Sequence, residues 1–208
     1  MTYNPTRTLI AQLAARLMQE HGIRDFSQAK RKAARQLGIV DAHHLPGNEE
    51  IEDAIREYNA VYHADTQPEL LRELRREALG IMEMLARFDP HLTGAVLNGT
   101  ASPYSGIQIE LFTDNEKEVE MYLLNQNLPF RQGQCTSSGN LGKRPVPCFI
   151  LDSGQNDIRI TVQPPLAMRR SQRNSNEPLR RASLTQLKTL IAEDSAAIAQ
   201  ASASQSAT

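Results

Sequence analysis

The sequence predicts an α+β fold, in which an N-terminal helical unit packs on a small domain with a mixed sheet. Two observations support this prediction. Before residue 88, apolar residues recur at helical spacing in four successive segments with short links. After residue 93, short apolar runs that alternate with polar residues are separated by turn residues, as in strands. We therefore expect a helical unit over residues 1–88, an α/β domain over residues 93–194 and a disordered tail over residues 195–208.

The composition is that of a globular chain without a strong overall charge. The 208 residues are 40% hydrophobic and 23% charged, and the formal net charge is −1. Such a chain has enough apolar residues for a core, and any binding of nucleic acid must come from a local patch. The N-terminus has no signal-peptide apolar core, and no apolar run is long enough to span a membrane. We expect a cytoplasmic protein without a membrane partner, and no pattern predicts an oligomeric state.

Neither the cysteines nor the histidines have metal-ligand spacing. Cys135 and Cys148 are the two cysteines of the chain. In the cytoplasm we expect them to be reduced thiols, with a disulfide as the alternative. The adjacent His43 and His44 have no further ligand at a suitable distance in the sequence, so no metal site is predicted there.

The four N-terminal helices are predicted from apolar faces and from residues that cap helix ends. Ser27 is expected to cap the second helix, and Thr66 with Glu69 forms a capping box at the start of the fourth. Glycines 22 and 38 are expected to end the first two helices. The predicted ranges are 7–21, 27–37, 48–62 and 67 to about 88.

Two segments concentrate positive charge. The second predicted helix carries Lys30, Arg31, Lys32 and Arg35. Clustered cations on a small helix can neutralise phosphates of a nucleic acid, and a solvated helix face is the alternative interpretation. The second segment is an arginine-rich linker, which is either an anion-binding site or a solvated basic linker. Its arginines are Arg169, Arg170, Arg173, Arg180 and Arg181.

The second half of the chain alternates strands with turns and one helix. A buried strand is predicted at residues 95–97, followed by a turn at Asn98-Gly99 and a second strand at residues 107–112. Thr113 and Glu116 form a capping box for a helix that ends near residue 127. Three further strands are expected at residues 130–135, 148–151 and 158–162. A last helix, capped by Ser183 and Gln186, is expected over residues 183–194.

A strand, a glycine-containing turn and a strand with a carboxylate together resemble the core of the nucleotidyltransferase superfamily, which has the polymerase-beta-like fold. In that family the turn holds a nucleoside triphosphate, and two acids on the next strand hold two magnesium ions. Gly99-Thr100 stands at the turn of this chain. The acid pair falls on Gly106 and Gln108 in one register, and on Gln108 and Glu110 in the register shifted by two.

The resemblance implies the fold with a degenerate metal site. Glycine has no side-chain oxygen and glutamine a neutral one, whereas two-metal chemistry needs several anionic oxygens. The strand expected to carry the family's third acid has Arg159 instead. We expect a regulatory or non-catalytic protein that binds a nucleotide or another phosphorylated ligand. The predicted ligand-binding residues are Asn98, Gly99, Thr100, Ser105, Gln108 and Arg159.

Three alternatives stay open. The first is an active nucleotidyltransferase that uses Glu110 as a catalytic residue and magnesium as its cofactor. The second is a nucleic-acid-associated protein that uses the basic helix and the arginine-rich linker. The third is a scaffold or oligomerisation role. The first predicts binding of divalent metal, and the second predicts a steep dependence of DNA or RNA binding on salt.

Overall fold

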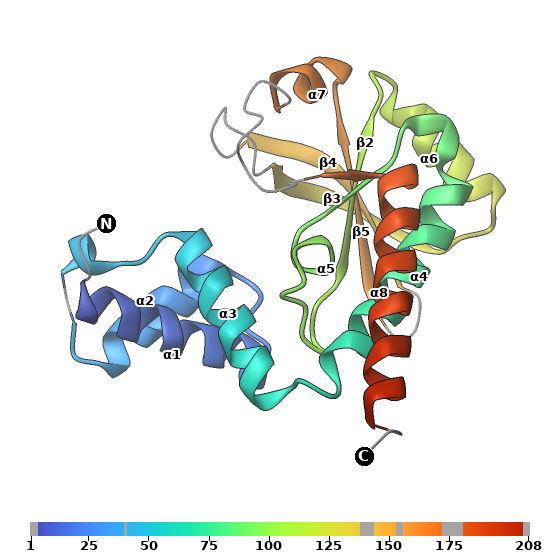
Figure 1. Ribbon diagram of the computed structural model, residues 1–208. Coiled ribbons are helices and arrows are strands. Elements are labelled where there is room, and N and C mark those ends of the chain that lie inside the picture. The colour runs from blue at the N-terminus through green and yellow to red at the C-terminus, as the bar shows by residue number, and fades with distance from the viewer. Residues whose placement is uncertain (1–3, 40, 138–143, 153–155, 172–180, 206–208) are drawn as a thin grey trace. The chain divides into compact units, whose positions relative to one another are not determined.

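The structure is a computed structural model, and it describes residues 4–39, 41–137, 144–152, 156–171 and 181–205 (Figure 1). The chain divides into two compact units. The first consists of Met1–Leu71 and Gly99–Ser105, and the second of Arg72–Asn98 and Gly106–Thr208. The boundary between them therefore lies inside the fourth helix rather than after residue 88.

The first unit is built from three helices around an alanine-rich core. Small side chains of the first two helices, including Ala14, Ala15, Ala29 and Ala33, are fully buried and allow the helices to approach closely. The second helix is capped by Asp25, whose carboxylate accepts a hydrogen bond of 2.7 Å from the backbone N–H of Gln28, and not by Ser27. The elements are α1 (Pro5–His21), α2 (Phe26–Gln36), a short 3₁₀ helix (Ala42–His44) and α3 (Asn48–Tyr62).

The segment Gly99–Ser105 is tied to the helices of the first unit by side-chain amides. Gln19 of α1 donates a hydrogen bond of 3.0 Å to the carbonyl of Thr100. Gln67, at the start of the fourth helix, donates to the carbonyl of Ala101 at 2.8 Å. These contacts explain why the segment belongs with the helices, although its neighbours in the sequence belong to the sheet.

The second unit contains a mixed sheet, and the prediction of an α+β fold is confirmed. In the described parts of the chain the strand order is β3-β4-β5-β2-β1-β6, with β2 parallel to β5 and the other pairs antiparallel. The strands are β1 (His91–Thr93), β2 (Ile107–Phe112), β3 (Phe130–Ser137), β4 (Arg144–Asp152), β5 (Asp157–Gln163) and β6 (Ala182–Ser183). The helices are α4 (Gln67–Met84), a 3₁₀ helix (Ala86–Phe88), α5 (Ala95–Asn98), α6 (Glu116–Asn125), α7 (Pro165–Ser171) and α8 (Leu184–Gln205).

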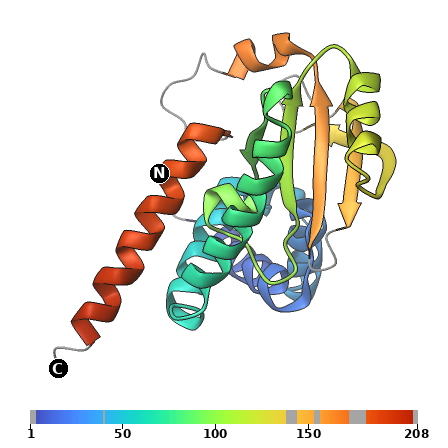
Figure 2. The ribbon, with the colours of Figure 1, turned by 90° about the vertical axis from the view of Figure 1, so that its right-hand side faces the viewer.

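One face of this sheet is buried and the other is partly open. Alternate residues of β2 and β5 are isoleucines with no or almost no exposed surface, among them Ile107, Ile109 and Ile160. The helices α4 and α5 lie on the same side of the sheet (Figure 2). Residues between the isoleucines, such as Gln108 and Arg159, are exposed on the opposite face. We call this opposite side the polar face.

The segment before β2 differs from the prediction. Residues 95–97, expected to form a strand, lie in the four-residue helix α5, and the strand β1 comes earlier, at His91–Thr93. Gly94 separates the two elements in the left-handed conformation, with φ of 73°. This conformation turns the chain out of the sheet before the apolar residues Val96 and Leu97, which are buried from a helix instead of a strand.

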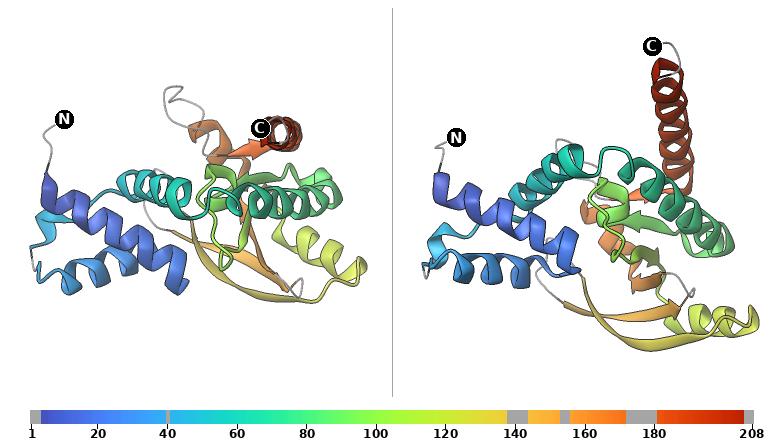
Figure 3. Two further views of the ribbon diagram at one scale, coloured as in Figure 1. Left: turned by 60° about the horizontal axis from the view of Figure 1, so that its bottom comes forward. Right: turned by 90° about the horizontal axis from the view of Figure 1, so that it is seen from below.

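Two helix ends also differ. α6 is capped by Asn115, which accepts a hydrogen bond from the Glu118 amide, and not by the Thr113 capping box. α8 begins as predicted. The backbone N–H of Ser183 donates to the side chain of Gln186, and the backbone N–H of Gln186 donates to the hydroxyl of Ser183. It then continues to Gln205 through residues expected to be disordered, and Figure 3 shows it, in red, extending away from the sheet. The segment is rich in alanine, the strongest helix former.

Cys135 and Cys148 form a disulfide between β3 and β4, so the expectation of two reduced thiols is wrong. Gly133 pairs with Cys148 and Cys135 pairs with Val146, which makes the cysteines diagonal neighbours on one face of the hairpin. Their Cα atoms are 5.7 Å apart, within the range that a disulfide spans. None of the helices in the described ranges is both long enough and apolar enough to cross a bilayer.

Candidate functional site

Two of the predicted ligand-binding residues, Gln108 and Arg159, lie on the polar face of the sheet. Gln108 of β2 and Arg159 of β5 are register neighbours in a parallel pair, so their side chains leave the sheet on the same side. Both are exposed. Arg159 has no ion-pair partner among the residues that the structure describes. A guanidinium beside a neutral amide can bind an anionic oxygen through charge-assisted hydrogen bonds.

Glu110 lies further along the same face but is already paired. The guanidinium of Arg181 contacts one oxygen of its carboxylate, and the amide of Gln163 donates to the other oxygen at 2.8 Å. The side chains of Glu110 and Arg181 are 13% and 17% exposed. Arg181 also lies over the ring of Phe112, at 5.2 Å from its centre. The carboxylate is therefore neutralised inside the protein, and its oxygens are engaged.

Gly106 has no room for a side chain. A Cβ atom at this position would lie 2.6 Å from the carbonyl oxygen of Asp157. That distance is shorter than carbon and oxygen atoms tolerate without movement of the backbone. The close approach occurs where β2 and β5 begin to pair, at Ile107 and Ile158. An acid at this position would therefore require β5 to move.

Gln108 is held near the turn that follows β1. A Cβ atom at Gly94 would lie 3.0 Å from the side-chain carbonyl carbon of Gln108. The glutamine side chain thus packs directly on the backbone of Gly94. The glycine turn beside the β2 site residues is consequently at Gly94, whereas the sequence prediction placed it at Gly99.

The remaining predicted ligand-binding residues are buried or make hydrogen bonds within or next to their own segment. Asn98 ends α5, and its backbone N–H donates to the carbonyl of Gly94 at 3.0 Å. Thr100 belongs to the first unit and is only 4% exposed. Ser105, in the same segment, accepts a hydrogen bond of 2.9 Å from the Ser102 amide. The carbonyl of Gly99 accepts a hydrogen bond from Gln67.

The residue that sequence reasoning missed is Arg181. It was grouped with the arginine-rich linker, of which residues 172–180 lie outside the described residues. Its pairing with Glu110 joins positions far apart in the sequence, and only the register of β6 on β1 brings them together. The one sequence signal was the presence of several arginines next to the last helix.

No metal centre is evident among the described residues, where no three His, Cys, Asp or Glu side chains are grouped to hold an ion. Three residues stand where the nucleotidyltransferase family would have its metal-binding acids. Gly106 and Gln108 supply no carboxylate, and the carboxylate of Glu110 is paired with Arg181. These residues therefore do not fit a pair of magnesium ions. No protein-family model, curated protein or solved structure matches this chain.

Proposed function

We propose that the second unit binds a nucleotide or another phosphorylated ligand on its polar face, without a metal ion and without catalysis. The proposal rests on a difference between Glu110 and Arg159, two charged residues of the polar face. Glu110 is paired with Arg181, whereas Arg159, on the adjoining strand of the same face, has no ion-pair partner among the described residues. In the part of the chain that the structure describes, the polar face thus offers Arg159 as a cation without an ion-pair partner, while the Glu110 carboxylate is engaged.

The order of elements supports a relationship of this unit to the nucleotidyltransferase fold. From β1 to β5 the described chain runs strand, short helix, strand, helix and three strands, close to the order that the resemblance implies. In this proposal the metal-binding function has been lost. Arg159 supplies fixed positive charge where the family would use magnesium, and Gln108 supplies an amide that can donate or accept a hydrogen bond.

The proposal is tested by thermal unfolding of the full chain with ATP, GTP and pyrophosphate, each in the presence of EDTA. A ligand at 100 times its Kd stabilises the folded state by about 2.7 kcal/mol, which corresponds to a rise in Tm of roughly 5–10 °C for a chain of this size. Arg159→Gln should lower the rise to about half or less, because a tenfold weaker affinity at the same ligand concentration leaves about 1.4 kcal/mol of stabilisation. Arg76→Gln, the control, removes an exposed arginine of α4 and should leave the ligand-induced rise in Tm unchanged.

Two results would count against the proposal. One is that none of these anions stabilises the protein at millimolar concentration. The other is that a nucleotide stabilises Arg159→Gln as much as the wild type. A metal-dependent transfer of nucleotide that disappears in Glu110→Gln would instead support the active nucleotidyltransferase.

A further inference from the structure

The helix α2 presents a group of exposed cations. Arg31, Lys32 and Arg35 are exposed, and none of them has an ion-pair partner among the described residues. Residues three and four positions apart are neighbours on a helix surface, so Arg35 lies beside both Lys32 and Arg31, and the three charges form one patch. No acidic residue occurs within Phe26–Gln36 to offset them.

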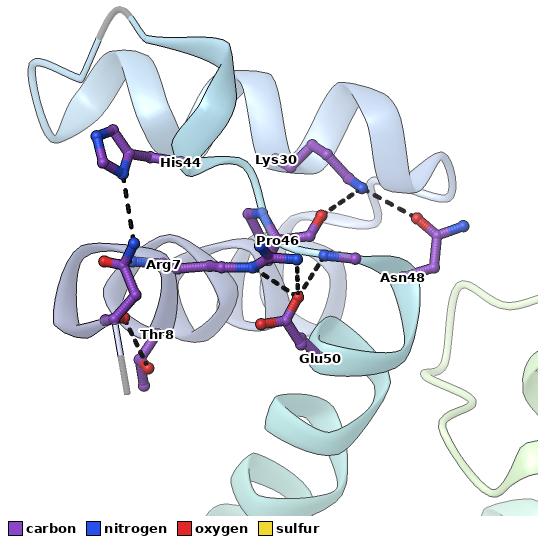
Figure 4. Close-up of polar contacts among 9 residues, drawn as sticks. Arg7, Thr8, Lys30, His44, Pro46, Asn48 and Glu50 are labelled. Atoms are coloured by element: carbon purple, nitrogen blue, oxygen red, sulfur yellow. Dashed lines mark hydrogen bonds and ion pairs between the residues drawn. The ribbon is translucent and has the colours of Figure 1, made fainter. Parts of the chain in front are cut away.

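The opposite side of α2 fixes the helix to the rest of its unit. Ala29, Ala33 and Ala34 are buried in the core that α2 shares with α1. Lys30 is turned away from the patch, because its ammonium group donates to the carbonyl of Pro46 at 2.7 Å and to the side chain of Asn48 at 3.1 Å (Figure 4). Lys30 therefore stabilises the unit, whereas its three basic neighbours are available to a partner.

Half of the acidic residues of the first unit lie on α3, and some of them are paired with arginines. Glu50, near the start of α3, is paired with Arg7 of α1 (Figure 4). Further along α3, Asp53 is paired with Arg56. Positive charge is thus concentrated on α2 even though the chain as a whole has a net charge of −1. Such a separation directs an anionic partner to one surface.

The patch has the chemistry and the dimensions of a nucleic-acid contact. It borders a hollow lined by Asp25, Ser27, Gln28, Arg31, Lys32 and Arg35. From Gln28 to Arg35 the helix rises about 10 Å. The DNA major groove is about 12 Å wide and admits one helix, and phosphates follow one another every ~3.4 Å along each strand.

We infer that this face of α2 binds duplex DNA, with Arg31, Lys32 and Arg35 on backbone phosphates and Gln28 towards the bases. The composition of the hollow favours DNA over a membrane surface, because interfacial helices need large apolar side chains beside their cations and the hollow has none. DNA is favoured over duplex RNA, because the major groove of A-form RNA is too narrow for side chains to read. The inference concerns the first unit and does not depend on the ligand of the second.

The test is fluorescence anisotropy of a labelled 20-base-pair DNA duplex titrated with the full chain at several salt concentrations. Three phosphate contacts predict a slope of log K against log salt of about −2.7, and each neutralised cation should reduce its magnitude by about 0.9. Lys32→Gln should therefore weaken binding and flatten the slope by one step. The triple variant Arg31→Gln, Lys32→Gln, Arg35→Gln should lose most of the salt-dependent binding.

The matched control is Arg56→Gln, which removes the same charge from an exposed arginine of α3 in the same unit. It should bind DNA like the wild type. Circular dichroism should show that the triple variant keeps its helices, since the three side chains have no partners within the described chain.

Three outcomes would overturn the inference. The first is no binding at 50 mM salt with the protein at about 10⁻⁴ M, near the weak limit of non-specific DNA binding. The second is unchanged binding by the folded triple variant or by Lys32→Gln. The third is equal or tighter binding of duplex RNA, or of vesicles with anionic lipids, which would assign the patch to a different partner.

Discussion

Replacing Gly106 by alanine should destabilise the second unit, because the added methyl group collides with the neighbouring strand. The new Cβ atom would lie 2.6 Å from the carbonyl oxygen of Asp157, and the two atoms must separate by about 0.8 Å to reach an ordinary contact of 3.4 Å. The oxygen belongs to the backbone at the start of β5, so no side-chain rotation relieves the clash. Overpacking of this kind typically costs about 1–3 kcal/mol.

The assay is urea or thermal unfolding followed by circular dichroism. A loss of 1–3 kcal/mol corresponds to a fall in Tm of roughly 2–12 °C for a chain of this size. Gly80→Ala is the matched control, because Gly80 lies in α4 with nothing within 4 Å of the added Cβ atom. That substitution should stabilise the protein by up to about 1 kcal/mol, as alanine is the better helix former.

The stability of Gly106→Ala also tests whether a metal-binding acid could fit at this position. If Gly106→Ala were as stable as the wild type to within about 0.5 kcal/mol, the strands would have room to adjust. An acid could then be accommodated at this position, and the geometric reason for a metal-free site would be refuted.

Three further predictions concern stability. Arg75→Ala should cost about 3–5 kcal/mol in urea unfolding, because Arg75 is nearly buried and pairs with Asp194 of α8; a cost below 1 kcal/mol would contradict this. Reduction of the Cys135–Cys148 disulfide should cost about 3 kcal/mol, as expected from its loop length, and no effect of a dithiol would contradict the pairing. Burial raises the pKa of Glu50, but hydrogen bonds from Arg7 and from the Gly47 backbone outweigh burial and lower it. The stability that Glu50 contributes is therefore present above the ordinary glutamate pKa and is lost as the pH falls through the pKa of the folded state. Glu50→Gln should therefore lower the free energy of unfolding by less than about 1 kcal/mol at pH 7 and should not change it in acid. A loss of stability that persists in acid would contradict the role of the Arg7–Glu50 ion pair.

The helices of the first unit could be predicted closely because their signals are local. The range 48–62 predicted for α3 is the range observed, and the apolar periodicity and capping residues lie within the segment itself. The errors there are small and local as well: α2 starts one residue earlier than expected, since Asp25 is the better-placed cap.

The segment that links the two units was harder to predict. A short apolar run such as Ala95–Leu97 fits a buried strand or a buried helix equally well, and only the left-handed turn at Gly94 decides between them. Nor does the sequence show that Gly99–Ser105 returns to the N-terminal helices through hydrogen bonds from Gln19 and Gln67.

The candidate site could be predicted only where it depends on a single strand. Alternation along β2 and β5 correctly placed Gln108 and Arg159 on the face opposite the isoleucines. Pairings between distant segments, such as Glu110 with Arg181, follow from strand register and could not be predicted. Reduced thiols were expected from the predicted cytoplasmic compartment, and the alignment of β3 and β4 that brings the two cysteines together is not visible in the sequence.

The most direct test of the account is the affinity of the chain for ATP, measured by isothermal titration calorimetry with EDTA and then with excess magnesium. Arg159 has no ion-pair partner among the described residues, and Glu110 is paired with Arg181. We therefore predict that ATP binds in EDTA, that magnesium does not strengthen this binding, and that Arg159→Gln weakens it at least tenfold. Binding that requires magnesium, is lost in Glu110→Gln and is indifferent to Arg159→Gln would contradict it.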